Sequence, residues 1–160
     1  LNIGTTFHIY LPASTKPVPY RPKYKATESL PQLHGTILVM DDQEIVRNLL
    51  NEVLKEIGYD VVLTEDGAAA IERYTEPKKS GKTFDAVILD LTIPGGMGGE
   101  ETIKKLLEID PEVKAIVSSG YINDAILSDF KKSGFSAVLS KPYNLKDLQN
   151  TLHSMLNIKQ

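Results

Sequence analysis

The sequence predicts an α/β fold in which one parallel β-sheet is covered by helices on both faces. Three observations support this prediction. Short runs rich in Val, Ile and Leu recur five times between residues 36 and 140. A segment with helical periodicity follows each run, and this strict alternation favours parallel strands joined by crossover helices. The length of 160 residues and the apolar fraction of 41% suffice for one such domain with an appendage.

The expected strands are short and largely apolar, as strands buried on both faces should be. A flavodoxin-like strand order, 2-1-3-4-5, would make the five strand–helix units a three-layer sandwich with ligands binding beyond the carboxyl ends of the strands. The strands are predicted over Thr36–Met40, Tyr59–Leu63, Ala86–Leu89, Lys114–Ser118 and Ala137–Ser140.

The segments between these strands have the apolar spacing of helices. The first helix is expected to end at Gly58, with one apolar face made of Ile45, Leu49, Leu50, Val53, Leu54 and Ile57. Three further helices are predicted over Ala68–Tyr74, Glu100–Ile109 and Asp124–Lys132. The closing helix has a stripe formed by Leu145, Leu148, Leu152, Met155 and Leu156.

The first 35 residues differ from the rest of the chain. Residues 2–11 alternate apolar and more polar side chains, as in a half-buried strand. Five prolines between Pro12 and Pro31 then indicate an extended linker. We therefore divide the chain into a strand remnant at 1–14, a linker at 15–35 and a folded domain at 36–160. Because the sequence begins with Leu1, we expect it to be a piece of a longer protein.

Composition excludes several classes of function. The chain has no cysteine, which excludes disulfides, thiolate zinc sites and cysteine nucleophiles. From residue 36 onward, 20 acidic residues outnumber 14 basic ones, so we expect no nucleic-acid binding. No apolar run approaches the roughly 20 residues of a membrane span, so no membrane contact is expected.

Acidic residues follow two of the expected strands. Asp41 and Asp42 come after the first strand, and Asp90 comes after the third. In the expected order these strands are neighbours, so the carboxylates should converge, where each pair at ~4 Å repels by roughly 1 to 4 kcal/mol. A divalent cation relieves this repulsion, and Mg²⁺ prefers oxygen ligands and bridges carboxylates to phosphoryl groups. The acidic cluster alone predicts a place for a cation and a phosphate. Together with Ser119 and Lys141 after two further strands, it predicts magnesium-assisted phosphorylation of an aspartate.

Polar residues follow the fourth and fifth strands as well. Lys141, before Pro142, is a candidate point charge for a phosphate. Ser118 and Ser119 end the fourth strand, and a hydroxyl there can donate a hydrogen bond to a phosphoryl oxygen. The residue pattern leaves open which of the two serines has this role.

Four motifs in order, ILVMDDQE, VILDLTIPGGMGG, AIVSSGY and LSKPYNLKDL, resemble those of response-regulator receiver domains over about residues 36–158. The resemblance implies that Asp90 is the phosphoacceptor. It implies that Asp42, Asp90 and the carbonyl of Thr92 bind Mg²⁺ directly, whereas Asp41 acts largely through water. It also implies a phosphohistidine donor.

The same resemblance assigns the remaining site residues. Lys141 becomes the phosphate-binding lysine, and Ser119, directly before Gly120, becomes the switch hydroxyl. The chain departs from the family pattern at Val138, three residues before the lysine, where many receivers have an aromatic residue. This departure puts an aromatic switch in doubt.

The segment GTTFHIYLPAS resembles the last strand of the ATP-binding domain of sensor histidine kinases. This second resemblance implies a hybrid histidine kinase, whose kinase core is the phosphodonor and in which a histidine phosphotransfer protein can act downstream. It implies a cytoplasmic location, with a parent that can be membrane-anchored. The glycine-rich and asparagine boxes of the kinase domain are absent, so this chain should not bind ATP through it.

Two alternatives from other classes remain at this point. A haloacid-dehalogenase-like phosphatase also uses an aspartyl phosphate and Mg²⁺, but its nucleophile follows the first strand in an Asp-x-Asp pattern, which MDDQE lacks. A pseudo-receiver would bind partners without being phosphorylated. Whether the chain counts as an enzyme is also open, since a receiver contributes chemistry only to its own phosphorylation and dephosphorylation.

Overall fold

The sheet has five parallel strands in the predicted order, β2-β1-β3-β4-β5. The computed structural model describes residues 4, 6–10, 12, 35–79, 83–120 and 129–156, with 77–79 as backbone alone. Each predicted strand is present, with shifts of at most one residue at its ends. The strands are β1 (Thr36–Met40), β2 (Asp60–Thr64), β3 (Ala86–Asp90), β4 (Ala115–Ser119) and β5 (Ala137–Ser140).

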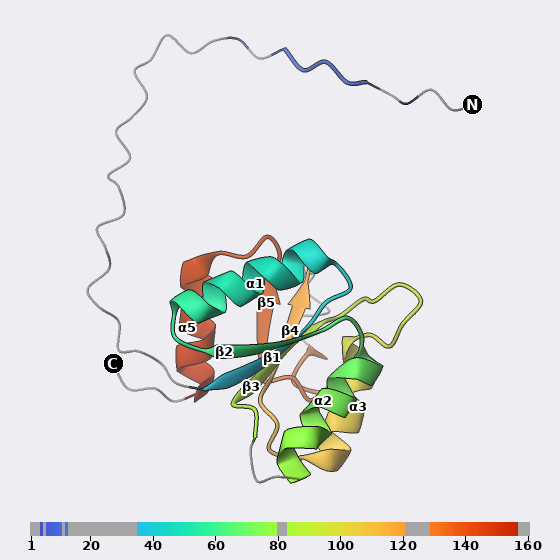
Figure 1. The fold of residues 1–160 in the computed structure, drawn as a ribbon, viewed down its shortest axis with the longest axis vertical. Helices are drawn as coiled ribbons and strands as arrows, with labels where there is room; N and C mark the ends of the chain where they lie inside the picture. The colour runs from blue at the N-terminus through green and yellow to red at the C-terminus, as the bar shows by residue number, and fades with distance from the viewer. Residues whose placement is uncertain are drawn as a thin grey trace.

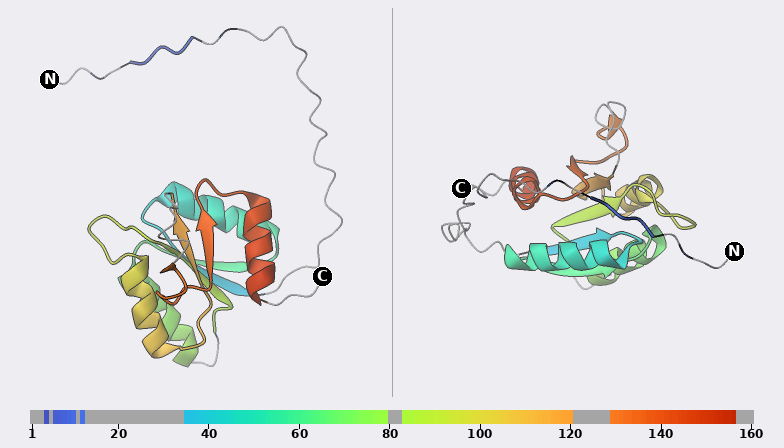
Figure 2. Two further views of the ribbon diagram at one scale, coloured as in Figure 1. Left: turned by 180° about the vertical axis from the view of Figure 1, so that it is seen from behind. Right: turned by 90° about the horizontal axis from the view of Figure 1, so that it is seen from above.

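Helices cover both faces of this sheet (Figure 1), which confirms the three-layer prediction. Helices α1 and α5 lie on one face, and α2 and α3 lie on the other (Figure 2). Their bounds are α1 (Glu44–Glu56), α2 (Gly67–Lys79), α3 (Gly99–Ile109) and α5 (Leu145–Leu156). Helix α2 continues past the predicted end at Tyr74. The predicted helix over Asp124–Lys132 falls mostly outside the described residues, which resume at Asp129.

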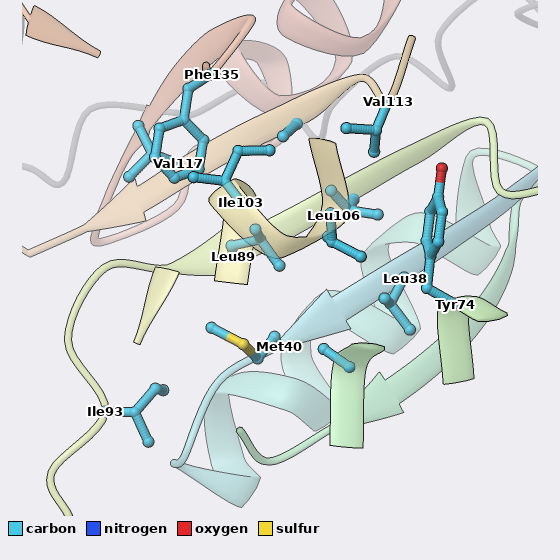
Figure 3. Close-up of a cluster of buried hydrophobic side chains, with 13 residues drawn as sticks. Leu38, Met40, Tyr74, Leu89, Ile93, Ile103, Leu106, Val113, Val117 and Phe135 are labelled. Carbon is cyan, nitrogen blue, oxygen red and sulfur yellow. The ribbon is translucent and has the colours of Figure 1, made fainter. Parts of the chain in front are cut away.

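Alternate residues of each strand enter two separate cores. In β1, Ile37 and Val39 point to the core beneath α1 and α5, whereas Leu38 and Met40 point to the core beneath α2 and α3. The second of these cores is drawn in Figure 3. Both faces of the strand are therefore buried, which explains its uninterrupted apolar sequence.

The apolar face predicted for α1 is only partly correct. Leu50 and Leu54 are buried, but Ile45 is 78% exposed and Leu49 is 48% exposed. Ile45 and Leu49 are one turn apart and lie on a different side of the helix from the two buried leucines. The sheet contacts only one side of α1, so Ile45 and Leu49 form an uncovered part of its apolar stripe.

The amino-terminal segment shows no strand at residues 6–10. Phe7, Ile9 and Tyr10 are each more than four-fifths exposed. A strand needs a neighbour for its backbone hydrogen bonds, and no strand among the described residues pairs with this segment. The rest of the predicted 2–11 strand and nearly all of the linker lie outside the described residues.

Within the part of the chain that the structure describes, no helix combines the length and apolar character of a membrane span.

The loop between β3 and α3 depends on glycine at three positions. Gly95 has φ +74°, a conformation that side chains disfavour. A Cβ atom on Gly98 would lie 2.6 Å from the carbonyl oxygen of Leu91, and one on Gly99 would lie 2.8 Å from that of Asp90. The start of α3 therefore packs directly on the backbone at the end of β3.

We expect Gly98→Ala to destabilise the domain, because the new methyl group would meet backbone that cannot rotate away. Overpacking of this kind costs about 1 to 3 kcal/mol in the free energy of unfolding, measurable by urea denaturation. Gly120→Ala is the matched control, since its Cβ would meet no atom of the described residues within 4 Å. Equal stability of the two variants would contradict this account of the loop.

Candidate functional site

The parallel sheet brings the three predicted aspartates together. Asp90 is the last residue of β3, and Asp41 directly follows β1, its hydrogen-bonded neighbour, in which Met40 is paired with Leu89. Carboxylate oxygens of Asp41, Asp42 and Asp90 all lie within 4.8 Å of one another. Asp41 and Asp90 are buried, whereas Asp42 is exposed. The cluster thus opens to solvent on the side of Asp42.

Lys141 reaches two of these carboxylates from the end of β5. Its Nζ donates hydrogen bonds to Asp41 Oδ2 at 2.5 Å and to Asp90 Oδ2 at 2.7 Å. Its side chain is 18% exposed, and its peptide bond to Pro142 is cis. The structure therefore places the predicted lysine in direct contact with the predicted phosphoacceptor.

Burial and the ion pairs act in opposite directions on the pKa values of the site. Burial raises the pKa of Asp90 above its ordinary value, and the hydrogen bond from Lys141 opposes that rise. Burial alone would lower the pKa of Lys141, but its hydrogen bonds to Asp41 and Asp90 raise it overall. The lysine therefore remains a cation at neutral pH, and this single ammonium faces a cluster of three carboxyl groups.

Backbone and side-chain hydrogen bonds hold the turn after β1. Arg47 of α1 donates through Nη1 to the carbonyl oxygens of Asp41 at 2.7 Å and Asp42 at 2.9 Å. The amide of Gln43 donates to Asp41 Oδ1 at 2.9 Å. Arg47 was not predicted as a site residue, because a basic residue in the first turns of a helix gives no signal of where its side chain bonds.

The other residues singled out from the sequence have different environments. Thr92 is exposed, and its amide donates to Asp90 Oδ1 at 3.4 Å. Ser119 ends β4 and is 7% exposed, and its carbonyl oxygen accepts a hydrogen bond from the amide of Lys141 at 2.9 Å. Val138 in β5 is half-buried against the core beneath α2 and α3.

The second candidate serine has a different environment. Ser118 is 1% exposed, and its Oγ lies 2.7 Å from the hydroxyl oxygen of Tyr143. Tyr143, two residues after Lys141, was not predicted to belong to the site. A contact between residues 25 positions apart leaves no local pattern in the sequence.

Comparison with known proteins identifies the family. A model described as the response regulator receiver domain matches residues 37–153. The chain belongs to the response regulator receiver family. It is 32% identical over 160 residues to the sensor kinase CckA of Brucella abortus, covering 96% of this chain but only 16% of that kinase. It is also 33% identical to the receiver protein CpdR of the same organism, covering 75% of this chain and 95% of that protein.

Solved receiver structures share the fold. One is the receiver domain of a sensor histidine kinase from Pseudomonas aeruginosa, with a TM-score of 0.68 and 20% identity, covering 78% of this chain and 99% of that one. That structure has a magnesium ion coordinated in its active-site cleft.

The acidic site of this receiver domain fits a magnesium ion. Receiver domains bind Mg²⁺ at an acidic site and take phosphoryl groups from histidine kinases or phosphotransfer proteins. Three convergent carboxylates, one of them exposed, offer the oxygen ligands that Mg²⁺ prefers and leave room for the waters it keeps. A divalent cation would also offset the negative charge that Lys141 leaves unbalanced.

We expect Lys141→Met to lower the free energy of unfolding in the absence of Mg²⁺. It would leave Asp41 and Asp90 without their hydrogen-bonded cation, and breaking a buried pair in this way costs about 3 kcal/mol. Adding Asp41→Asn to this variant should recover part of the loss by removing one uncompensated charge.

Urea denaturation measures this effect. Lys104→Met, at an exposed position of α3, is the matched control and should leave stability unchanged. If the urea midpoints of Lys141→Met and Lys104→Met coincide, the stabilising role of the ion pairs is refuted.

Proposed function

We propose that this receiver domain accepts a phosphoryl group from a phosphohistidine onto Asp90, as part of a phosphorelay. One observation supports this most directly: the Asp90 carboxylate lies beside two further carboxylates while Lys141 donates to it at 2.7 Å. The site thus combines a nucleophile, Asp90, with carboxylates that can bind a cation and a lysine ammonium that can bind phosphate. Positioning and charge stabilisation are the main needs of phosphoryl transfer.

The proposed transfer is an in-line displacement. An Asp90 carboxylate oxygen forms the bond to phosphorus as the bond from phosphorus to the histidine nitrogen breaks, and the imidazole leaves with that electron pair. The ammonium of Lys141 binds a phosphoryl oxygen during the transfer and stabilises its negative charge. The hydroxyl of Ser119 donates a hydrogen bond to another phosphoryl oxygen. This bond would couple phosphorylation of Asp90 to the end of β4.

We assign the metal ligands as Asp42, Asp90 and the carbonyl of Thr92, with Asp41 acting largely through water. The exposure of Asp42 and the burial of Asp41 agree with this division. When bound, Mg²⁺ would supply positive charge to the phosphoryl oxygens in the transition state.

We further propose that the chain is the carboxyl-terminal part of a hybrid sensor histidine kinase. Residues 1–14 would end its ATP-binding domain, 15–35 would link the domains and 36–160 would form the receiver. The match to CckA supports this, because it extends over 96% of the chain rather than over the receiver alone. The phosphodonor would then be the cytoplasmic kinase core, and a histidine phosphotransfer protein would be the next acceptor.

The uncovered part of α1 supports a protein as the phosphodonor. Exposed Ile45 lies three residues after Asp42, and Leu49 continues the same ridge one turn further. Any histidine that reaches Asp90 must bring its surrounding surface to this rim of the site. Exposed apolar side chains there would gain free energy by contact with a donor helix.

Asp90→Ala should abolish labelling by acetyl phosphate with Mg²⁺ present, because it removes the attacking oxygen. Removing Mg²⁺ with a chelator should also abolish labelling of the unaltered protein. Phosphate incorporation, followed by mass spectrometry, measures both effects. Undiminished labelling of Asp90→Ala would refute the assignment of Asp90.

The alternatives give different results in the same assay. An unaltered protein that takes no label and binds no fluoroberyllate with Mg²⁺ would be a pseudo-receiver. Turnover of a phosphate ester would instead indicate a phosphatase of the haloacid-dehalogenase type.

Ile45→Ser should slow transfer from the phosphorylated kinase core by about tenfold, since losing one central apolar contact costs about 1.4 kcal/mol. Labelling by acetyl phosphate should stay unchanged, because a small donor does not contact α1. Lys104→Ser on α3, which covers the opposite face of the sheet, is the control. Equal transfer rates for the two variants would exclude a contribution of this ridge to donor binding.

A further inference from the structure

A hydrogen bond between two hydroxyl groups lies beside the acidic cluster and has no part in the chemistry proposed above. Ser118 Oγ and the hydroxyl oxygen of Tyr143 are 2.7 Å apart. Ser118 is 1% exposed within β4. Tyr143 packs against the core beneath α1 and α5.

This hydrogen bond connects the two segments that carry the proposed phosphoryl ligands. Ser118 directly precedes Ser119, and Tyr143 comes two residues after Lys141. A second link joins the same segments, because the amide of Lys141 donates to the carbonyl oxygen of Ser119 at 2.9 Å. The end of β4 and the turn after β5 are therefore tied once through backbone and once through side chains.

The two hydroxyl groups form a hydrogen bond, which fixes the relative position of their side chains more strictly than apolar packing does. A buried hydroxyl is unfavourable unless it is hydrogen-bonded, and the half-buried Tyr143 supplies the partner that the buried hydroxyl of Ser118 needs. Burial raises the pKa of Tyr143, which keeps its phenol protonated at neutral pH. Tyr143 lies two residues after Lys141, so a movement of its ring would also move the turn that carries the lysine.

We infer that Tyr143 is a positioning residue, whose hydrogen bond to Ser118 fixes the spacing between Lys141 and Ser119 so that both meet one phosphoryl group. The inference rests on the proposed function of Asp90, because it concerns ligands of the phosphoryl group that Asp90 receives. Tyr143 itself does not touch that group. It acts through the two segments that it ties together.

Fluoroberyllate, which imitates the phosphoryl group on an aspartate, separates positioning from packing. Tyr143→Phe and Ser118→Ala should each weaken fluoroberyllate binding at saturating Mg²⁺ by about fivefold, the effect of one ordinary hydrogen bond. Their affinity for Mg²⁺ alone, measured by calorimetry, should not change, because the carboxylates are untouched. The double variant should bind fluoroberyllate as well as the weaker single variant, since both remove the same bond.

Tyr59→Phe is the matched control. Tyr59 is 2% exposed in the same core, and among the described residues its hydroxyl has no hydrogen-bond partner. It directly precedes β2, so it lies at the edge of the sheet opposite the site. Removal of its hydroxyl should leave both affinities unchanged.

The outcomes distinguish this inference from the function on which it rests. If the unaltered protein and Asp90→Ala bind fluoroberyllate equally, the proposed function fails. If binding requires Asp90 but Tyr143→Phe binds as tightly as Tyr59→Phe, only the positioning role is overturned. A Tyr143→Phe variant that loses stability to urea while keeping full affinity would also overturn it, as would losses that multiply in the double variant.

Discussion

The contact of Lys141 with Asp41 and Asp90 is the interaction on which the site depends. Acidic side chains crowded at the edge of a sheet repel one another, and burial makes that repulsion stronger. The ammonium of Lys141 offsets it at 2.5 and 2.7 Å without occupying the open side of the cluster near Asp42. The structure thus tolerates a concentration of charge that leaves space for a metal ion and a phosphoryl group.

The arrangement follows from parallel strands. Every strand of this sheet ends at the same edge, so residues at the carboxyl ends of β1, β3, β4 and β5 come close together although they are far apart in the chain. The cores beneath α1 and α5 and beneath α2 and α3 hold the strands from both sides. Arg47 and the glycines of the β3–α3 loop then fix the backbone that carries the aspartates.

Much of this could be predicted from the sequence, and the failures have physical reasons. Apolar runs identified all five strands, and parallel order placed Asp41, Asp90 and Lys141 together. The exposure of Ile45 could not be predicted, because helical periodicity does not reveal how wide a face the sheet will cover. The Ser118–Tyr143 contact was equally hidden, since a hydroxyl pair has no spacing rule and forms only once β4 and β5 are adjacent.

The sequence separation of the lysine contacts has a consequence for biosynthesis. Lys141 lies 100 positions from Asp41 and 51 positions from Asp90. The ribosome therefore releases both aspartates well before the residue that neutralises them, and β1 and β3 can pair while the cluster is still uncompensated. Closing loops of this length costs conformational entropy before the contacts are made. Because Lys141 directly follows β5, its contacts with Asp41 and Asp90 can form only after that strand has joined the sheet.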